Sequence, residues 1–146
     1  MKLLMIYCTK FAFDPTIQTL EEFPEVKEGG RYNDMLVAFI HAEAHDEENA
    51  VGVERKLIKN LKWAAKKNNT NKVLLHSFAH LAETKADPHF TKEIFDRAEA
   101  RMKMLITNVT KLLLDIFWIW ISRHLEFHRP EFLKDFSCWY YIYSTL

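Results

Sequence analysis

The sequence predicts a compact single domain of the α/β class, a β-sheet with crossover helices. Short apolar runs typical of buried strands are separated by longer segments whose apolar residues recur every three or four positions. The chain has 146 residues, of which 49% are hydrophobic and only three are glycine, and this composition is globular. Because the order is strand, strand, helix, strand, helix, we expect crossover connections between strands.

Three segments have the composition of buried strands. Residues 3–7 and 35–40 are continuous apolar runs, and residues 72–78 form the third. The stretch from 14 to 33 is polar and acidic, with two prolines and a pair of glycines. We therefore expect residues 14–33 to be mostly a connection.

Two further segments have helical periodicity. Apolar residues stand three or four apart from Val53 onward, until Asn68 and Asn69 end the pattern. A second helix is expected after Asp87, because this residue suits an N-cap and the next one, Pro88, suits the first helical position.

The first helix carries a basic outer face. Its members are Lys56, Lys59, Lys62, Lys66 and Lys67. Such a face either contacts RNA phosphates or is simply the solvated side of a helix, and both interpretations remain open.

Charge and targeting signals exclude several classes of protein. Basic and acidic residues number 20 each, so no global field draws the chain to DNA or to anionic lipid. The apolar run that opens the chain is too short for a secretory signal, and residues 112–121 are half of a membrane span. The two cysteines have neither disulfide nor zinc spacing, which favours buried thiols. We expect a cytoplasmic protein that binds no DNA and no membrane.

The segment that ends the third strand holds the residues best suited to chemistry. Residues 76–81 read His-Ser-Phe-Ala-His-Leu, and ligands of α/β sheets bind at the carboxyl ends of strands. His80 is a candidate to act as a general base or to position a water; alternatively, it caps the strand end. No glycine-rich phosphate loop, nucleophile elbow or Cys–His pair is present, so we expect neither a cofactor nor serine-hydrolase chemistry.

Histidines spaced four apart raise the question of a metal. The first two pairs follow strands, where a spacing of four does not bring two side chains to one metal ion. The third pair has no obvious third ligand. We expect a solvated surface position and no metal for all three pairs: His41 and His45, His76 and His80, His124 and His128.

Two ordered segments resemble the N-terminal editing domain of archaeal threonyl-tRNA synthetase. They are residues 36–40 with the acidic residues up to Glu48, and, beyond a helix, residues 77–81. The resemblance covers residues 1–111 and is strongest to short, free-standing members that lack the synthetase body.

The resemblance implies a D-aminoacyl-tRNA deacylase-like fold, usually a homodimer, that removes serine wrongly attached to threonine tRNA. In such domains the aminoacyl-tRNA 3′ end enters a pocket between two strand ends, and backbone groups, the RNA 2′-hydroxyl and a positioned water carry much of the chemistry. His80 matches the family histidine and would be catalytic, while Ser77 replaces a proline common in synthetase-linked members. The substrate-binding residues would be Val37, Ala38, Phe39, Ser77, Phe78 and Ala79. A hydrolytic site separate from the aminoacylation site is needed, because binding alone discriminates poorly between amino acids with similar small side chains.

Residues 112–146 depart from the family pattern. They contain three of the four tryptophans, where the family continues with a Pro-Phe-Gly-aromatic segment and a final strand. Residues 112–120 can be back-translated so that a shifted frame encodes Pro-Phe-Gly-Tyr-Phe-Leu-Asp-Leu-Asp, the expected segment. We hypothesise a frameshifted tail that replaces the last strand of the family, and resequencing the gene tests this.

Three functions are consistent with these observations. The leading one is a trans-editing hydrolase that acts on seryl-tRNA(Thr) or a similar wrongly aminoacylated tRNA. The second is a catalytically silent module of the same fold that binds tRNA or threonyl-tRNA synthetase, and the third is a structural domain. We expect no synthetase activity from this chain alone.

Overall fold

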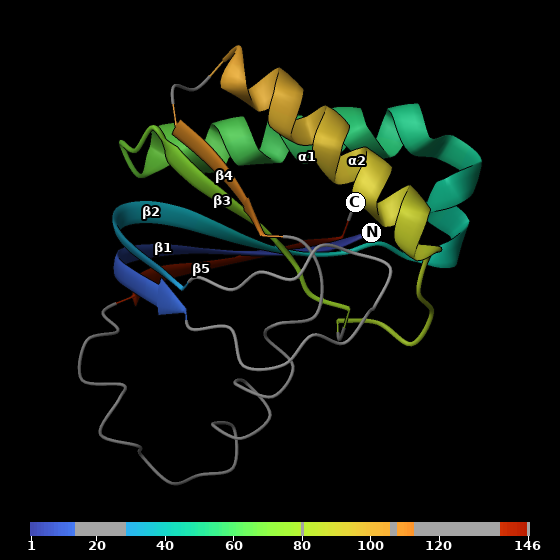
Figure 1. Cartoon of the computed structure of the whole chain (residues 1–146), viewed down its shortest axis with the longest axis horizontal. Helices are drawn as coiled ribbons and strands as arrows, with labels where there is room; N and C mark the ends of the chain where they lie inside the picture. The colour runs from blue at the N-terminus through green and yellow to red at the C-terminus, as the bar shows by residue number, and fades with distance from the viewer. Residues whose placement is uncertain (14–28, 80, 106–107, 113–137, 146) are drawn as a thin grey trace, which may run out of the picture.

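The fold is a mixed five-stranded sheet with two helices on one face. The computed structural model describes residues 1–13, 29–79, 81–105, 108–112 and 138–145 (Figure 1). The strands lie in the order β4-β3-β2-β1-β5. Their bounds are β1 Lys2–Phe13, β2 Gly30–His41, β3 Lys72–Ser77, β4 Asn108–Leu112 and β5 Cys138–Thr145; the helices are α1 Ala50–Lys67 and α2 Pro88–Lys103.

The connections confirm the predicted α/β class. β1 and β2 pair antiparallel, whereas β2, β3 and β4 are parallel and are joined through α1 and then α2. Parallel neighbours require such crossovers, and each helix returns the chain to the end of the sheet at which the parallel strands begin. As a result, the carboxyl ends of β2 and β3 lie side by side.

The prediction that residues 14–33 are mostly a connection was wrong at its end. β2 begins at Gly30, and Lys10 of β1 pairs with Asn33. Polar side chains hid this part of the strand, because backbone hydrogen bonds extend the hairpin beyond the buried region whatever its side chains are. Residues 14–28 lie outside the described part of the chain.

Two strands of the sheet, β4 and β5, were not expected. β5 pairs antiparallel with β1 along the edge opposite β4, with Leu3 against Ser144. It lies in the segment that departs from the family pattern. Because residues 113–137 are not described, the frameshift hypothesis stays a prediction.

Two apolar clusters, one on each face of the sheet, account for the strand pattern. The cluster under the helices contains Leu3, Ala38 and Leu75 together with Leu57 of α1 and Phe95 of α2. The buried residues described for the cluster on the other face belong to β1, β2 and β3: Ile6, Cys8, Phe11, Met35, Val37, Phe39 and Leu74. Strands buried on both faces read as continuous apolar runs, which is how they could be predicted. Cys8 is buried, as expected of a structural thiol.

Both helices begin at a side-chain cap, and the cap of α2 was predicted from the sequence. The Asp87 side chain accepts hydrogen bonds from the backbone N–H of His89 and Phe90, and Pro88 occupies the first helical position, which confirms the prediction for α2. At α1, the Asn49 side chain accepts from the N–H of Gly52. These caps satisfy amide groups that have no partner inside the helix. Among the described helices, none is long and apolar enough to cross a membrane.

A buried carboxylate joins the two helices. Glu54 of α1 is 2% exposed and forms ion pairs with Arg97 and Arg101 of α2, the latter at 2.7 Å between Oε1 and Nη1. Both arginines are partly exposed, so water can hydrate them if the carboxylate is removed. The two ion pairs therefore connect the helices, and their net contribution to stability is modest because burial of the carboxylate is costly.

Replacing Glu54→Gln is expected to lower the free energy of unfolding by about 1–2 kcal/mol, between the values for buried and surface ion pairs. The matched control is Glu93→Gln, which removes the exposed i,i+4 partner of Arg97 and should cost under about 0.5 kcal/mol. Urea unfolding of both variants measures the difference. Equal losses would show that the burial of Glu54 is unimportant.

Candidate functional site

The candidate site is formed where two parallel strands end. In the register of β2 and β3, Phe39 lies opposite His76 and Ile40 opposite Ser77. The pairing continues one residue beyond β3, where the Phe78 N–H donates to the carbonyl of Ile40 at 2.9 Å. The two strand ends that the sequence analysis singled out are therefore direct neighbours. They lie at the carboxyl ends of the strands, where α/β sheets bind ligands.

The side chains of these residues divide between the two faces of the sheet. Val37 and Phe39 pack with Phe78 on the face without helices, and the Phe39 and Phe78 rings meet edge to face at 5.6 Å. Ala38 points the other way, into the core beneath the helices. This follows from the alternation of side chains along a strand. Ala38 is fully buried between Met5 of β1 and Leu75 of β3, and its role in substrate binding stays a prediction.

The remaining predicted residues follow the end of β3. Ser77 is 5% exposed, and Ala79 is half-buried. His80 lies outside the described residues, between Ala79 and Leu81.

His76 is a buried, neutral histidine beside these residues. It is 4% exposed, and its ring lies 5.2 Å from that of Phe39. Nδ1–H donates to the carbonyl of Ser77 at 2.7 Å, which fixes the tautomer. Burial lowers the pKa of His76 from 6.5 to about 4, an effect that this hydrogen bond only partly offsets. At neutral pH the strand end therefore carries no charge from this ring.

Comparison with known proteins identifies the family. Residues 1–112 match the archaea-specific editing domain of threonyl-tRNA synthetase. The chain belongs to this family.

Relatives of this editing domain are archaeal synthetases. It is 31% identical over 114 residues to a threonine–tRNA ligase of Pyrococcus furiosus, covering 76% of this chain and 18% of that protein. It is 30% identical over 105 residues to the corresponding ligase of Methanopyrus kandleri, covering 70% of this chain and 17% of the relative. The match thus spans less than a fifth of these synthetases.

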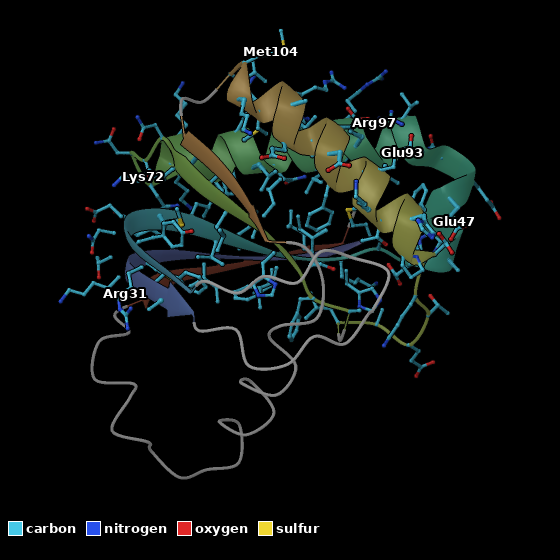
Figure 2. All side chains as sticks on the ribbon, viewed as in Figure 1. Arg31, Glu47, Lys72, Glu93, Arg97 and Met104 are labelled. Carbon is cyan, nitrogen blue, oxygen red and sulfur yellow. The ribbon has the colours of Figure 1, made fainter. Side chains whose placement is uncertain are left out.

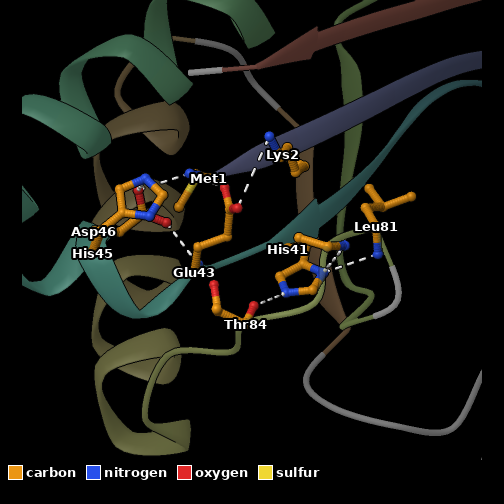
Figure 3. A network of polar contacts seen from close by, with 9 residues as sticks. Met1, Lys2, His41, Glu43, His45, Asp46, Leu81 and Thr84 are labelled. Carbon is orange, nitrogen blue, oxygen red and sulfur yellow. Dashed lines mark hydrogen bonds and ion pairs between the residues drawn. The ribbon is translucent and has the colours of Figure 1, made fainter.

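In this editing domain, His41 holds the loop that follows the site. It is fully buried at the end of β2, and its Nδ1 accepts hydrogen bonds from the N–H groups of Leu81 (2.9 Å) and Ala82 (3.1 Å) (Figure 3). Nε2–H donates to the carbonyl of Thr84 at 2.7 Å. One ring therefore fixes three backbone groups of residues 81–84, directly after the predicted catalytic position.

The prediction that His41 and His76 lie on a solvated surface was wrong. Both adjoin apolar strand segments, and a side chain in that position is buried with the strand whatever its polarity. Each ring compensates by bonding to backbone groups, which no sequence spacing reveals. His45 is exposed, as expected, whereas His124 and His128 are outside the described residues.

A second polar cluster lies near the start of β1. The Met1 ammonium group lies 2.7 Å from Asp46 Oδ1 and 2.9 Å from Glu43 Oε2 (Figure 3). Burial acts to raise the pKa of Glu43, but the ammonium group and Lys2 together lower it below its ordinary value. Glu43, His45 and Asp46 offer ligand atoms within 4.8 Å of one another. The ammonium group and Lys2 already form ion pairs with these carboxylates, so we assign no metal here.

Proposed function

We propose that this chain hydrolyses the ester of a wrongly aminoacylated tRNA, with seryl-tRNA(Thr) as the leading substrate. The observation that carries the proposal is the family match over residues 1–112, which includes both strand ends of the candidate site. Hydrolysis of such an ester by a second site is the chemistry that an editing domain contributes to translation. The reaction needs a water, the tRNA terminus and no cofactor.

The site geometry supports a specific division of roles. Phe78, which is partly exposed, would pack against a ribose or adenine ring, and the buried Phe39 and neutral His76 support it from within the sheet. Backbone groups of Ala79, which follows the end of β3, would orient the aminoacyl group. His80 would position or deprotonate the water that attacks the ester carbonyl. The bond between carbonyl carbon and ribose oxygen then breaks, releasing free serine and a tRNA with its terminal hydroxyl restored.

Deacylation assays test this proposal. We expect seryl-tRNA(Thr) to lose its amino acid much faster than threonyl-tRNA(Thr) in the presence of the protein, and His80→Ala to return the rate toward that of buffer. The control is His89→Ala, which changes an exposed histidine of α2. Loss of both esters at the buffer rate would remove the enzymatic claim.

The alternative is a catalytically silent module of the same fold that binds tRNA or threonyl-tRNA synthetase. It is favoured by the end of the family match at residue 112, because the chain departs from the family pattern beyond this point. A gel shift with tRNA without turnover would support it.

The finer structural expectations belong to the same proposal. We propose a D-aminoacyl-tRNA deacylase-like topology, a homodimer and a cytoplasmic location, where charged tRNA is found. The parallel β2-β3-β4 unit beside an antiparallel hairpin is consistent with that topology. Sedimentation equilibrium tests the homodimer.

A further inference from the structure

The outer surface of α1 carries uncompensated positive charge. Six exposed basic side chains project from it, and the only acidic residue of α1, Glu54, is buried against α2. Among the described residues, no carboxylate forms an ion pair with any of the six. We call this surface the basic face and define it as Arg55, Lys56, Lys59, Lys62, Lys66 and Lys67 together with Trp63.

The neighbouring helix shows the opposite arrangement. On α2, Lys92 pairs with Asp96 at 2.6 Å and Lys103 with Glu99 at 2.8 Å, each one turn apart. Such i,i+4 pairs are the usual way in which a solvated helix compensates its charges. Since the whole chain is neutral, the basic face is a local feature and not a result of composition.

An exposed tryptophan stands in the middle of these charges. Trp63 is 50% exposed, and Lys67 Nζ lies 5.0 Å from its ring centroid. Lys59 precedes it by four residues and Lys66 follows it by three, so these side chains border the ring on the helix surface. A cation–aromatic cluster open to solvent is a typical platform for nucleic acid, because phosphates bind the cations and a base or ribose stacks on the ring.

We infer that the basic face binds the sugar–phosphate backbone of tRNA, outside the 3′ terminus held at the strand ends. The identity of the nucleic acid rests on the proposed function; the charge and the aromatic ring do not depend on it. α1 has 18 residues and is therefore about 27 Å long, which is enough to follow several phosphates. The helix begins near the carboxyl end of β2 and runs toward Lys72 at the opposite end of the sheet (Figure 2). A tRNA whose 3′ terminus lies at the strand ends can thus contact α1 with nucleotides farther from that terminus.

RNA fits this surface better than the other anionic partners. A membrane-bound helix needs a broad apolar face, but the apolar face of α1 is already buried on the sheet, and Trp63 is the one large apolar side chain of the basic face. An acidic protein would satisfy the lysines without using the exposed ring as a stacking platform.

Binding of uncharged tRNA at several salt concentrations tests the inference. Lys59→Gln/Lys66→Gln is expected to weaken binding about tenfold at 0.1 M salt and to reduce the slope of log affinity against log salt by about 1.5, for two lost phosphate contacts. Trp63→Ala is expected to weaken binding about tenfold through lost stacking. The control, Lys92→Gln/Lys103→Gln, changes the net charge equally on α2 and should leave both quantities unchanged.

A small ester separates this inference from the proposed function. Hydrolysis of 3′-O-seryladenosine, which lacks the tRNA body, should be unaffected by the lysine and tryptophan variants. If this ester is stable in the presence of the protein, the proposed function fails, while the tRNA affinities still decide the inference. Equal weakening by the α2 control, or binding to anionic phosphatidylserine vesicles but not to tRNA, would overturn the inference.

Discussion

Replacing His41→Phe is expected to lower the deacylation rate about 100-fold and the free energy of unfolding by about 2–3 kcal/mol. The ring accepts from two backbone N–H groups and donates to the carbonyl of Thr84, and phenylalanine leaves all three without a partner. The rate effect arises because residues 81–84 lose the contacts that hold them next to His80, and small displacements of a catalytic group are costly. His41 is thus a positioning residue.

Conservative variants separate positioning from a general loss of structure. His41→Asn keeps an acceptor where Nδ1 stands and should restore part of both the rate and the stability, because the Leu81 and Ala82 amides regain a partner. Amide hydrogen exchange at these two residues should be fast in the phenylalanine variant and intermediate in the asparagine variant. Unchanged exchange in both would show that His41 does not hold the loop.

The second large effect concerns acid stability and depends on His76. Burial lowers the pKa of this histidine in the folded state to about 4, from the 6.5 of an exposed ring. Between these values the unfolded chain binds the proton and the folded chain does not, so the stability contributed by neutral His76 is complete above pH 6.5 and is lost as the pH falls toward 4. We expect a loss of about 2 kcal/mol between pH 8 and pH 5 from this one group.

Urea unfolding at pH 8 and pH 5 measures this effect. His76→Asn keeps a donor for the Ser77 carbonyl but cannot titrate, so its stability should change about 2 kcal/mol less between the two pH values. The control His89→Asn removes an exposed histidine and should behave like the unmodified protein. The same pH dependence in all three proteins would contradict the assignment. The low pKa of Glu43 acts in a separate window below pH 4.5.

Hydrophobic pattern was sufficient to predict most of the fold. The apolar runs at 3–7 and 35–40 lie in β1 and β2, because strands covered on both faces leave no polar alternation. Both helices were predictable from spacing and from the Asp87 cap. The hydrophobic pattern did not predict residues 30–33, where backbone pairing alone extends the hairpin. It also did not predict β4 or β5, and β5 pairs with β1 across more than a hundred positions.

The site was predictable only where side-chain identity carries the information. That the ends of β2 and β3 adjoin follows from the crossover that the sequence implies, whereas the register that places Phe39 opposite His76 does not. The role of His41 does not, because its partners are backbone groups about 40 residues away and any sequence offers such groups. Burial makes a neutral histidine hard to distinguish from a solvated one when only spacing is known.

The central claim is that the adjoining ends of β2 and β3 hold the aminoacylated terminus of tRNA. Amide chemical-shift mapping with a non-hydrolysable amide analogue of 3′-seryladenosine tests it most directly. We predict that the largest shifts fall on residues 39–41 and 77–82, with none near Lys72 at the far end of the sheet (Figure 2). Shifts confined to the far end, or saturating binding that leaves both strand ends unchanged, would contradict the account.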